Sequence, residues 1–385
     1  MKNILAAGLL VLAGCEQKLN PSRSASPSPP LVVPVPVPVA RATAPPARPG
    51  WAPPASTDTL VRLNRRSYRL RFEAETDSTQ PLTTTYTPFP GHTERAGGYE
   101  GRFTFTLRDS TGRQVFRRQL RKADFFARAG ADIVVESEAL LPSLLGYSVP
   151  LGALIFTLDF AVPNADVGSQ VVLLLDLTGK VLRMSEGRGL SGGADCDPVL
   201  AADGRTLLTP SEILRPNLPP LRLNKPNADL AGAFLLSDTT LLAVYAPGKT
   251  HLIRSPDGLD AVGRTPSRQQ LQAPNAFVRH TRSGRVLHAF RYGGFYEELG
   301  YTIPQHYLRA TATCYLLDEK RGLHLLPMAG AAAPIELRFA VMPVFVPPQK
   351  PAEVRFELQG SDRVFAFYVD TTRRLPHIRY QRLAN

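Results

Sequence analysis

Most of the chain beyond residue 56 alternates apolar and polar residues with a period of two. In "SYRLRFEAE", Tyr68, Leu70 and Phe72 alternate with charged residues, which places the apolar side chains on one face of a strand. "GRFTFTLRD" repeats the pattern, and residues 110–112 follow as a turn into "RQVFRRQL". "EVRFELQGSDRVFAFYVD" predicts a further hairpin near the C-terminus. These segments predict antiparallel strands joined by tight turns.

Helical periodicity is short and rare in this sequence. Only "RKADFFARAG" and "SEALLPSLLG" are predicted to form short helices, and Pro142 interrupts the second. Turn segments recur that place a glycine before a basic residue and an apolar strand; these glycines are Gly112, Gly179, Gly204 and Gly284. Their irregular spacing argues against a strict repeat array. We predict a mainly β protein with two antiparallel β-sandwich-like domains, 57–188 and 189–385, and an irregular β-propeller is the alternative.

The first 56 residues follow a different pattern that predicts no core. One lysine precedes an uncharged apolar run from Ile4 to Ala13, which is typical of a secretory signal peptide at residues 1–14. As a helix this run would span about 15 Å, roughly half of the apolar thickness of a bilayer. Residues 15–56 are rich in proline and include "VPVPVPV", which lacks the backbone donors that a helix or sheet needs. We therefore expect a disordered, proline-rich stalk in front of the β-domains.

The end of the leader carries a recognisable motif. Leu12-Ala13-Gly14-Cys15 resembles the lipobox of bacterial lipoproteins. The resemblance implies cleavage before Cys15, lipidation of its thiol and acylation of its new amino group, so that lipid chains hold the protein to a membrane. Glu16, rather than an aspartate, follows the cysteine, and the resemblance then implies the outer membrane rather than the inner one. The side of the membrane stays open, and an ordinary secretory leader is the alternative.

The first half of the globular part has a resemblance of its own. The segments "RKADFF", "FAVPNAD" and "VVLLLDLTGK" resemble uncharacterised lipoprotein domains of the Bacteroidetes type. This resemblance covers part of the chain and implies no known activity.

The chain is basic, with a formal net charge of +12. Basic residues cluster in "RLNRRSYRLRF" and "FRRQLRK" and would line neighbouring strands if these hairpins pair: Arg62, Arg65, Arg66, Arg69, Arg71, Arg117, Arg118, Arg121 and Lys122. A basic face attracts anions, so an anionic envelope component or another protein is an expected partner. The membrane is also an expected partner, through the lipid on Cys15. The sequence lacks the aromatic-basic motif of an RNA-binding sheet, and no nucleic-acid partner is predicted. A solvated basic surface without a specific partner is the alternative.

Two cysteines remain after the predicted anchor. Export would place Cys196 and Cys314 in a compartment where disulfides form, so a bridge between them is one expectation. Cys314 lies in "RATATCYLL", which alternates as a buried strand does, so two separate buried thiols are the other expectation.

Candidate chemistry is confined to one short region. Residues 189–193 match G-x-S-x-G, the nucleophile elbow of hydrolases, with Ser191 as the nucleophile, but "ADCDPVLAADG" does not suit the helix that must follow. Asp195 and Asp197 are candidate oxygen ligands for calcium, although a calcium site needs more oxygens than these supply. No cofactor is predicted. The sequence favours a non-catalytic, lipid-anchored envelope protein whose β-domains bind an unknown ligand or serve a structural role, with a serine hydrolase using Ser191 as the alternative.

Overall fold

The structure is a computed structural model. It describes residues 50–89, 92–189, 193–254, 260–328, 332–372 and 377–383. The described residues belong to one compact unit. The predicted leader, Cys15 and the stalk up to residue 49 lie outside the described residues.

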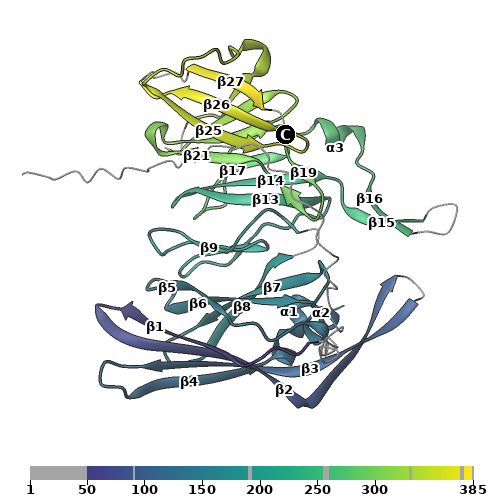
Figure 1. Cartoon of the computed structure of the whole chain (residues 1–385), viewed down its shortest axis with the longest axis vertical. Helices are drawn as coiled ribbons and strands as arrows, with labels where there is room; N and C mark the ends of the chain where they lie inside the picture. The colour runs from purple at the N-terminus through teal and green to yellow at the C-terminus, as the bar shows by residue number, and fades with distance from the viewer. Residues whose placement is uncertain are drawn as a thin grey trace, which may run out of the picture. The chain divides into compact units, whose positions relative to one another are not determined.

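Antiparallel sheets follow one another along the described chain, and within each sheet the strands lie side by side in chain order (Figure 1). The first sheet consists of β1 (Ala55–Leu63), β2 (Arg66–Phe89), β3 (His92–Arg108) and β4 (Gln114–Arg121). The second consists of β5 (Ser143–Ser148), β6 (Ala153–Ala161), β7 (Gly168–Leu175) and β8 (Val181–Gly189). The third consists of β9 (Val199–Leu200), β10 (Leu207–Leu208), β11 (Glu212–Leu214) and β12 (Leu221–Arg222).

Three further sheets complete the series. The fourth consists of β13 (Ala228–Ser237), β14 (Thr240–Pro247), β17 (Ala276–His280) and β18 (Val286–Phe290). The fifth consists of β21 (Gln305–Leu308), β22 (Thr313–Asp318), β23 (Gly322–Pro327) and β24 (Ile335–Arg338). The sixth consists of β25 (Glu353–Gln359), β26 (Val364–Asp370) and β27 (His377–Leu383). Two small hairpins pair β15 (Thr250–Arg254) with β16 (Asp260–Arg264) and β19 (Tyr296–Glu297) with β20 (Tyr301–Thr302).

The helices are short. They are η1 (Lys122–Phe125), α1 (Phe126–Ala129), α2 (Ala131–Glu136), α3 (Arg268–Gln272), η2 (Arg309–Thr311) and η3 (Phe339–Val341). None of the helices in the described part of the chain has the length and apolar character needed to span a membrane.

Consecutive sheets pack face to face on apolar layers, and the strand sequences explain why. In β6, Phe156 points into the layer shared with the first sheet, whereas the next residue back, Ile155, points into the layer shared with the third. A strand buried on both faces reads as a nearly continuous apolar run, and "ALIFTLDF" does so apart from Thr157 and Asp159. The first sheet has only one packed face, so Leu70 and Phe72 alternate with charged residues instead.

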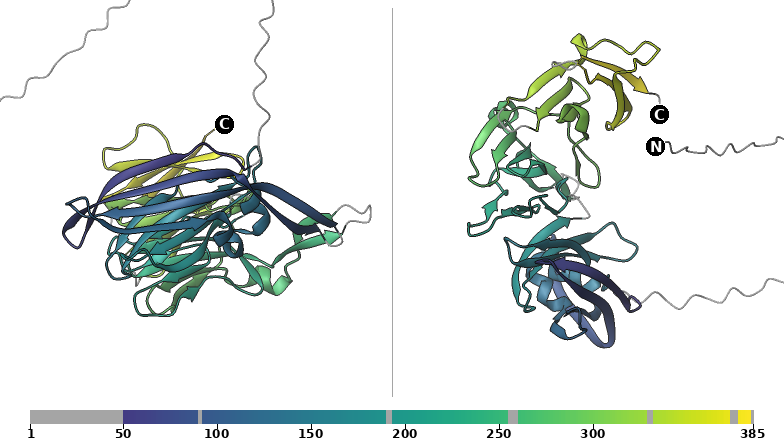
Figure 2. Two further views of the ribbon diagram at one scale, coloured as in Figure 1. Left: turned by 90° about the horizontal axis from the view of Figure 1, so that it is seen from below. Right: turned by 90° about the vertical axis from the view of Figure 1, so that its left-hand side faces the viewer.

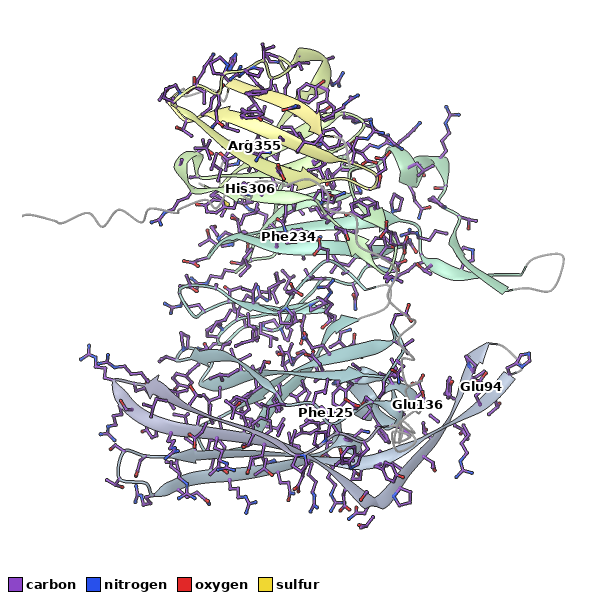
Figure 3. The ribbon with its side chains drawn as sticks, in the orientation of Figure 1. Glu94, Phe125, Glu136, Phe234, His306 and Arg355 are labelled. Carbon is purple, nitrogen blue, oxygen red and sulfur yellow. The ribbon has the colours of Figure 1, made fainter. Side chains whose placement is uncertain are left out.

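The layer between the first two sheets is aromatic. Phe125 of η1 lies inside it (Figure 3), with its ring centroid 5.6 Å from that of Phe103 and 5.3 Å from that of Phe160. These rings are fully buried and tilted or perpendicular to one another, which is the favourable geometry for aromatic pairs. The layer thus fastens η1 and the first sheet to β6.

The later layers repeat the two-sided arrangement. In β14, Leu241 packs toward the third sheet and Leu242 toward the fifth. In β22, Leu316 packs toward the fourth sheet and Leu317 toward the sixth. Figure 2 shows the same succession of sheets from the side, with the chain advancing from one layer to the next.

The fold confirms the predicted class, a mainly β protein built of antiparallel sheets with sandwich-like packing. The predicted turn glycines all have positive φ, of 86°, 83°, 68° and 71° at Gly112, Gly179, Gly204 and Gly284. This backbone conformation favours glycine in turns. The predicted domain boundary at 188/189 falls at the end of β8, and apolar contacts between the second and third sheets extend across it. The division into two domains stays a prediction.

One secondary-structure prediction is wrong. "SEALLPSLLG" forms no helix, because α2 ends before it at Glu136 and its second half forms β5. Pro142 cannot donate a hydrogen bond to a helix, whereas Ser143 pairs with Thr157 of β6 and gains the hydrogen bonds of a sheet. The helix predicted from "RKADFFARAG" is present as η1 and α1.

Candidate anion-binding surface

The face of the first sheet that points away from the apolar layer is rich in arginine. Leu70 and Phe72 turn inward, so Arg69 and Arg71 turn outward, and the register of the sheet aligns further outward residues with them. We call this face the arginine surface; its basic residues are Arg62, Arg69, Arg71, Arg102, Arg108, Arg117 and Arg121. Side chains project from this outer side of the sheet, at the bottom of Figure 3.

Two pairs of arginines face each other directly across neighbouring strands. Arg69 of β2 is opposite Arg108 of β3, and Arg102 of β3 is opposite Arg121 of β4. Side chains in such positions are about 5 Å apart at Cβ, and like charges there destabilise a sheet. The surface therefore concentrates positive charge at some cost to the fold.

Acidic neighbours neutralise part of this charge. Arg69 Nε lies 2.8 Å from Asp58 Oδ2, and Arg71 Nη2 lies 2.8 Å from Glu73 Oε1. The hydrogen bond from Arg69 holds the pKa of Asp58 below its ordinary value. These pairs are exposed, with 65% of the Arg69 side chain accessible, so water and salt screen them.

Other arginines of the surface keep their charge unpaired in the described part of the chain. Arg108 donates to the backbone oxygen of Gly112, at 3.1 Å, whereas Arg102 is paired, with its Nε atom 3.0 Å from Glu75 Oε1. Within the ranges that the structure describes, Arg117 and Arg121 form no ion pair. Guanidinium groups in this state are available to phosphate, sulfate or carboxylate groups, which they bind through two parallel hydrogen bonds.

A groove of about 640 Å³ crosses one end of the arginine surface. Its walls include Arg69, Arg71 and Arg108, together with Leu60 of β1 and the turn that joins β3 to β4. Asp109 of this turn accepts hydrogen bonds from the backbone and hydroxyl of Thr111, which lower the pKa of its carboxyl group. The carboxylate of Asp109 is thus bound by the turn. Asp58 also lines the groove and pairs with Arg69, which leaves Arg108 as the groove's guanidinium group without an acidic partner in the described part of the chain.

Part of the predicted basic cluster does not belong to the arginine surface. Arg65 forms the β1–β2 turn with a φ of 68°, and Arg66 and Arg118 are opposite the inward-facing Leu63 and Phe105. Lys122 is completely buried. Arg102 and Arg108, which the sequence prediction missed, occupy the polar positions of "GRFTFTLRD", so alternation alone could have identified them.

The predicted disulfide is not formed. Cys196 and Cys314 are both free and buried. Cys196 lies in the layer between the third and fourth sheets and Cys314 in the layer between the fourth and fifth, so the fourth sheet separates them. Adjacent layers are about 10 Å apart, too far for a bridge. Burial raises the pKa of both thiols, to about 12 for Cys314, so they behave as small apolar residues.

The predicted calcium ligands point to different partners. Asp195 Oδ2 accepts a hydrogen bond of 2.8 Å from the backbone of Ile303, and burial raises the pKa of this carboxyl group. Asp197 instead pairs with Arg188 at 3.2 Å and is largely exposed. The described residues contain no group of three or more metal-ligating side chains. Ser191 lies outside the described residues, and its interpretation as a hydrolase nucleophile stays a prediction.

Comparisons with known proteins identify no family. No protein-family model matches the chain, and no curated protein matches it in sequence. Among solved structures, it is similar to a protein of unknown function from Bacteroides caccae, at 13% identity and a TM-score of 0.23 over 63% of this chain and 78% of that one. BamB from Moraxella catarrhalis has 14% identity and a TM-score of 0.21, over 82% and 96% of the two chains. A Synechocystis apocarotenoid oxygenase variant has 7% identity and a TM-score of 0.23, over 85% and 61%. These scores are too low to support an argument about function.

Proposed function

We propose that the chain is a non-catalytic binding module of the bacterial cell envelope that holds an anionic envelope polymer on its arginine surface. The observation that carries this proposal is the pairing of Arg69 with Arg108 and of Arg102 with Arg121 across exposed strands. Such pairs cost stability in isolation. Asp58 and Glu75 already neutralise Arg69 and Arg102, and a bound polyanion would neutralise the second member of each pair.

The layout of the surface favours a polymer over a single small anion. Its arginines are distributed over all four strands of the sheet, and the groove beside Arg108 is open rather than enclosed. A chain with repeating phosphate or carboxylate groups can contact several guanidinium groups at once, and each contact adds to the others. Binding of this kind weakens as salt concentration rises.

The sequence supports a lipid anchor for this module. In this proposal Cys15 carries the lipid, and the outer membrane holds it. Residues 15–49 would then act as a tether, which in polyproline II form reaches roughly 100 Å. Such a tether lets the β-sheets meet polymers at a distance from the membrane.

Binding to dextran sulfate tests the arginine surface. We expect the unlipidated chain from residue 16 onward to bind this polyanion, and replacement of Arg108, Arg117 and Arg121 by glutamine to weaken binding on the order of tenfold. These arginines have no acidic partner in the described part of the chain, so their loss leaves no carboxylate unpaired. The matched control removes the same charge elsewhere, by glutamine at Arg282, Arg285 and Arg291, which are exposed. Equal losses in the two triple variants would show that net charge, not this surface, is responsible.

Membrane fractionation tests the anchor. We expect Cys15→Ser to abolish incorporation of a fatty-acid analogue and to release the protein from the membrane fraction, because the lipidated thiol is absent. Label that persists on the serine variant would contradict the anchor while leaving the polyanion-binding result unaffected.

A further inference from the structure

A lysine lies over two aromatic rings at the edge of the layer between the third and fourth sheets. Lys225 follows β12, and its Nζ atom lies 3.9 Å from the ring centroid of Tyr245 and 3.7 Å from that of Phe277. The two rings are 5.8 Å apart and inclined by 71°. The ammonium group is therefore held in place by cation–π contacts with residues of β14 and β17.

These residues border a pocket of about 310 Å³, which we call the lysine pocket. Prolines form much of its wall: Pro226, Pro247 and Pro274. The hydroxyl group of Tyr245 is already used, because it donates to the backbone oxygen of Leu223 at 2.8 Å. The ring faces are in contact with the ammonium, so the prolines and the Lys225 ammonium are groups that the pocket offers to a ligand.

The positive charge at this site has no acidic counterpart. Arg279, two residues beyond Phe277 on β17, has its Cζ atom 5.8 Å from the centroid of the Phe277 ring. Its Nε atom is buried and forms no hydrogen bond, and no ion pair to Lys225 or Arg279 exists in the described part of the chain. Burial, together with the charge of Arg279, lowers the pKa of Lys225 to about 8. An unpaired cation in apolar surroundings is costly, and an anion there would remove the cost.

We propose that the lysine pocket binds a small organic carboxylate, whose apolar body lies against the prolines and whose carboxylate pairs with Lys225. The volume is at the lower end of the range for small-molecule sites, which fits a single aromatic or branched aliphatic acid. A polyanion does not suit this pocket, because polymers of charged groups lack an apolar body. The lysine pocket and the arginine surface therefore select different classes of anion, and the inference stands independently of the proposed function.

Phenylacetate is a suitable probe, with phenylacetamide as its uncharged counterpart of similar shape. We expect calorimetry to show saturable binding of phenylacetate to the wild-type chain, and phenylacetamide to bind at least about tenfold more weakly because it cannot pair with the ammonium. Lys225→Met keeps an apolar side chain but removes the charge, and we expect a similar loss of phenylacetate affinity. Lys180→Met, at an exposed turn, is the control and should bind as the wild type does.

A second measurement needs no variant. In the wild-type chain, phenylacetate should slow the acetylation of Lys225 by an activated ester, because a paired ammonium loses its proton less readily, while Lys180 reacts at an unchanged rate. Mass spectrometry of the digested protein measures both rates. The inference is overturned if Lys225→Met binds phenylacetate as well as the wild type. It is equally overturned if phenylacetate, benzoate and hexanoate neither saturate the wild type nor protect Lys225 at about 10 mM.

Discussion

The first and the sixth sheet each have one packed face and one outward face. The two outward faces differ in how far other parts of the chain cover them. On the sixth sheet, residues 343–350 fold back over the strands: the ring of Phe345 stacks on Tyr368 at 3.7 Å, and Arg379 donates to the backbone oxygens of Val346 and Pro348. On the first sheet, the outward arginines are exposed to solvent, as the 65% accessible side chain of Arg69 illustrates.

Both faces use the same pair of chemical groups, a guanidinium and a carboxylate. Arg379 binds both oxygens of Glu353, at 2.8 and 2.6 Å, and the two side chains are 10% and 0% exposed. Arg69 approaches Asp58 to 2.8 Å, but both partners are in contact with solvent. A buried pair must stay intact, because either charge alone would be desolvated, whereas an exposed pair can exchange partners at little cost. Burial thus separates arginines that belong to the fold from arginines that can meet a ligand.

The largest expected effect comes from breaking the buried pair. Arg379→Met should lower the free energy of unfolding by about 3–5 kcal/mol, because the buried charge of Glu353 then keeps only the hydrogen bond from the backbone of Lys350. Arg69→Met, the matched change on the exposed face, should lower it far less, because water solvates both partners of that pair. Urea denaturation of the two variants measures the difference. Adding Glu353→Leu to Arg379→Met should restore part of the loss, because no unpaired charge then remains.

Similar losses in the two single variants would contradict the comparison. They would mean that the exposed pair contributes to the fold as much as the buried one does. The arginine surface would then have a structural role that its exposure does not indicate.

A smaller effect is expected where the first sheet meets α2. A Cβ atom at Gly98 of β3 would lie 2.0 Å from the backbone oxygen of Val135, whereas one at the adjacent Gly97 would meet nothing within 4 Å. Gly98→Ala should therefore lower the free energy of unfolding by about 1–3 kcal/mol, and Gly97→Ala should change it by about 0.5 kcal/mol or less. Thermal or urea unfolding of both variants measures this. Equal effects would show that β3 and α2 can move apart without cost.

Much of the fold could be predicted from the alternation of residues, and the failures have physical reasons. Alternation identified β2, β3 and β4 and their inward side chains, because one face of the first sheet is solvated. It could not show which sheets are neighbours, and for that reason the sequence left open whether Cys196 and Cys314 form a disulfide or are two separate buried thiols. The two cysteines are separated because the fourth sheet lies between them. The sequence around each cysteine does not predict that tertiary arrangement.

The candidate sites were predictable to different degrees. The arginine surface can be predicted from the polar, outward positions of adjacent strands once the pairing of those strands is known. The lysine pocket could not be predicted, because Lys225, Tyr245 and Phe277 come from separate segments that only the folded chain brings together. Lys122 was assigned to the basic surface by its charge, although the alternation of Leu120 and Arg121 already places the next residue inward.

Lys122 gives an effect that appears only within one pH window and so sharpens the comparison within one sheet. Its Nζ atom donates to the backbone oxygens of Tyr99, Val135 and Ser137, at 3.0, 3.1 and 2.7 Å. Burial lowers its pKa to about 8, partly opposed by the charge of Glu100. The unfolded chain keeps the ordinary lysine pKa of about 10.4, so between these values the unfolded state binds more protons than the native state does.

The free energy of unfolding should therefore rise with pH from about 8 to about 10.4, by up to about 3 kcal/mol from Lys122, because each unit of pKa difference corresponds to about 1.4 kcal/mol. Below this pH window Lys122 is charged in both states, and the native state is destabilised by the desolvation of the buried ammonium. Above the window Lys122 is neutral in both the native and the unfolded state. Lys225, whose pKa is also lowered, contributes a rise of the same sign, so the quantity to measure is the difference between the wild type and Lys122→Met across this pH range. Exposed Lys180→Met is the control and should keep the wild-type slope. If Lys122→Met keeps that slope as well, the ammonium of Lys122 is solvated in the native state, and the inward side of the first sheet is more open to water than its packing indicates.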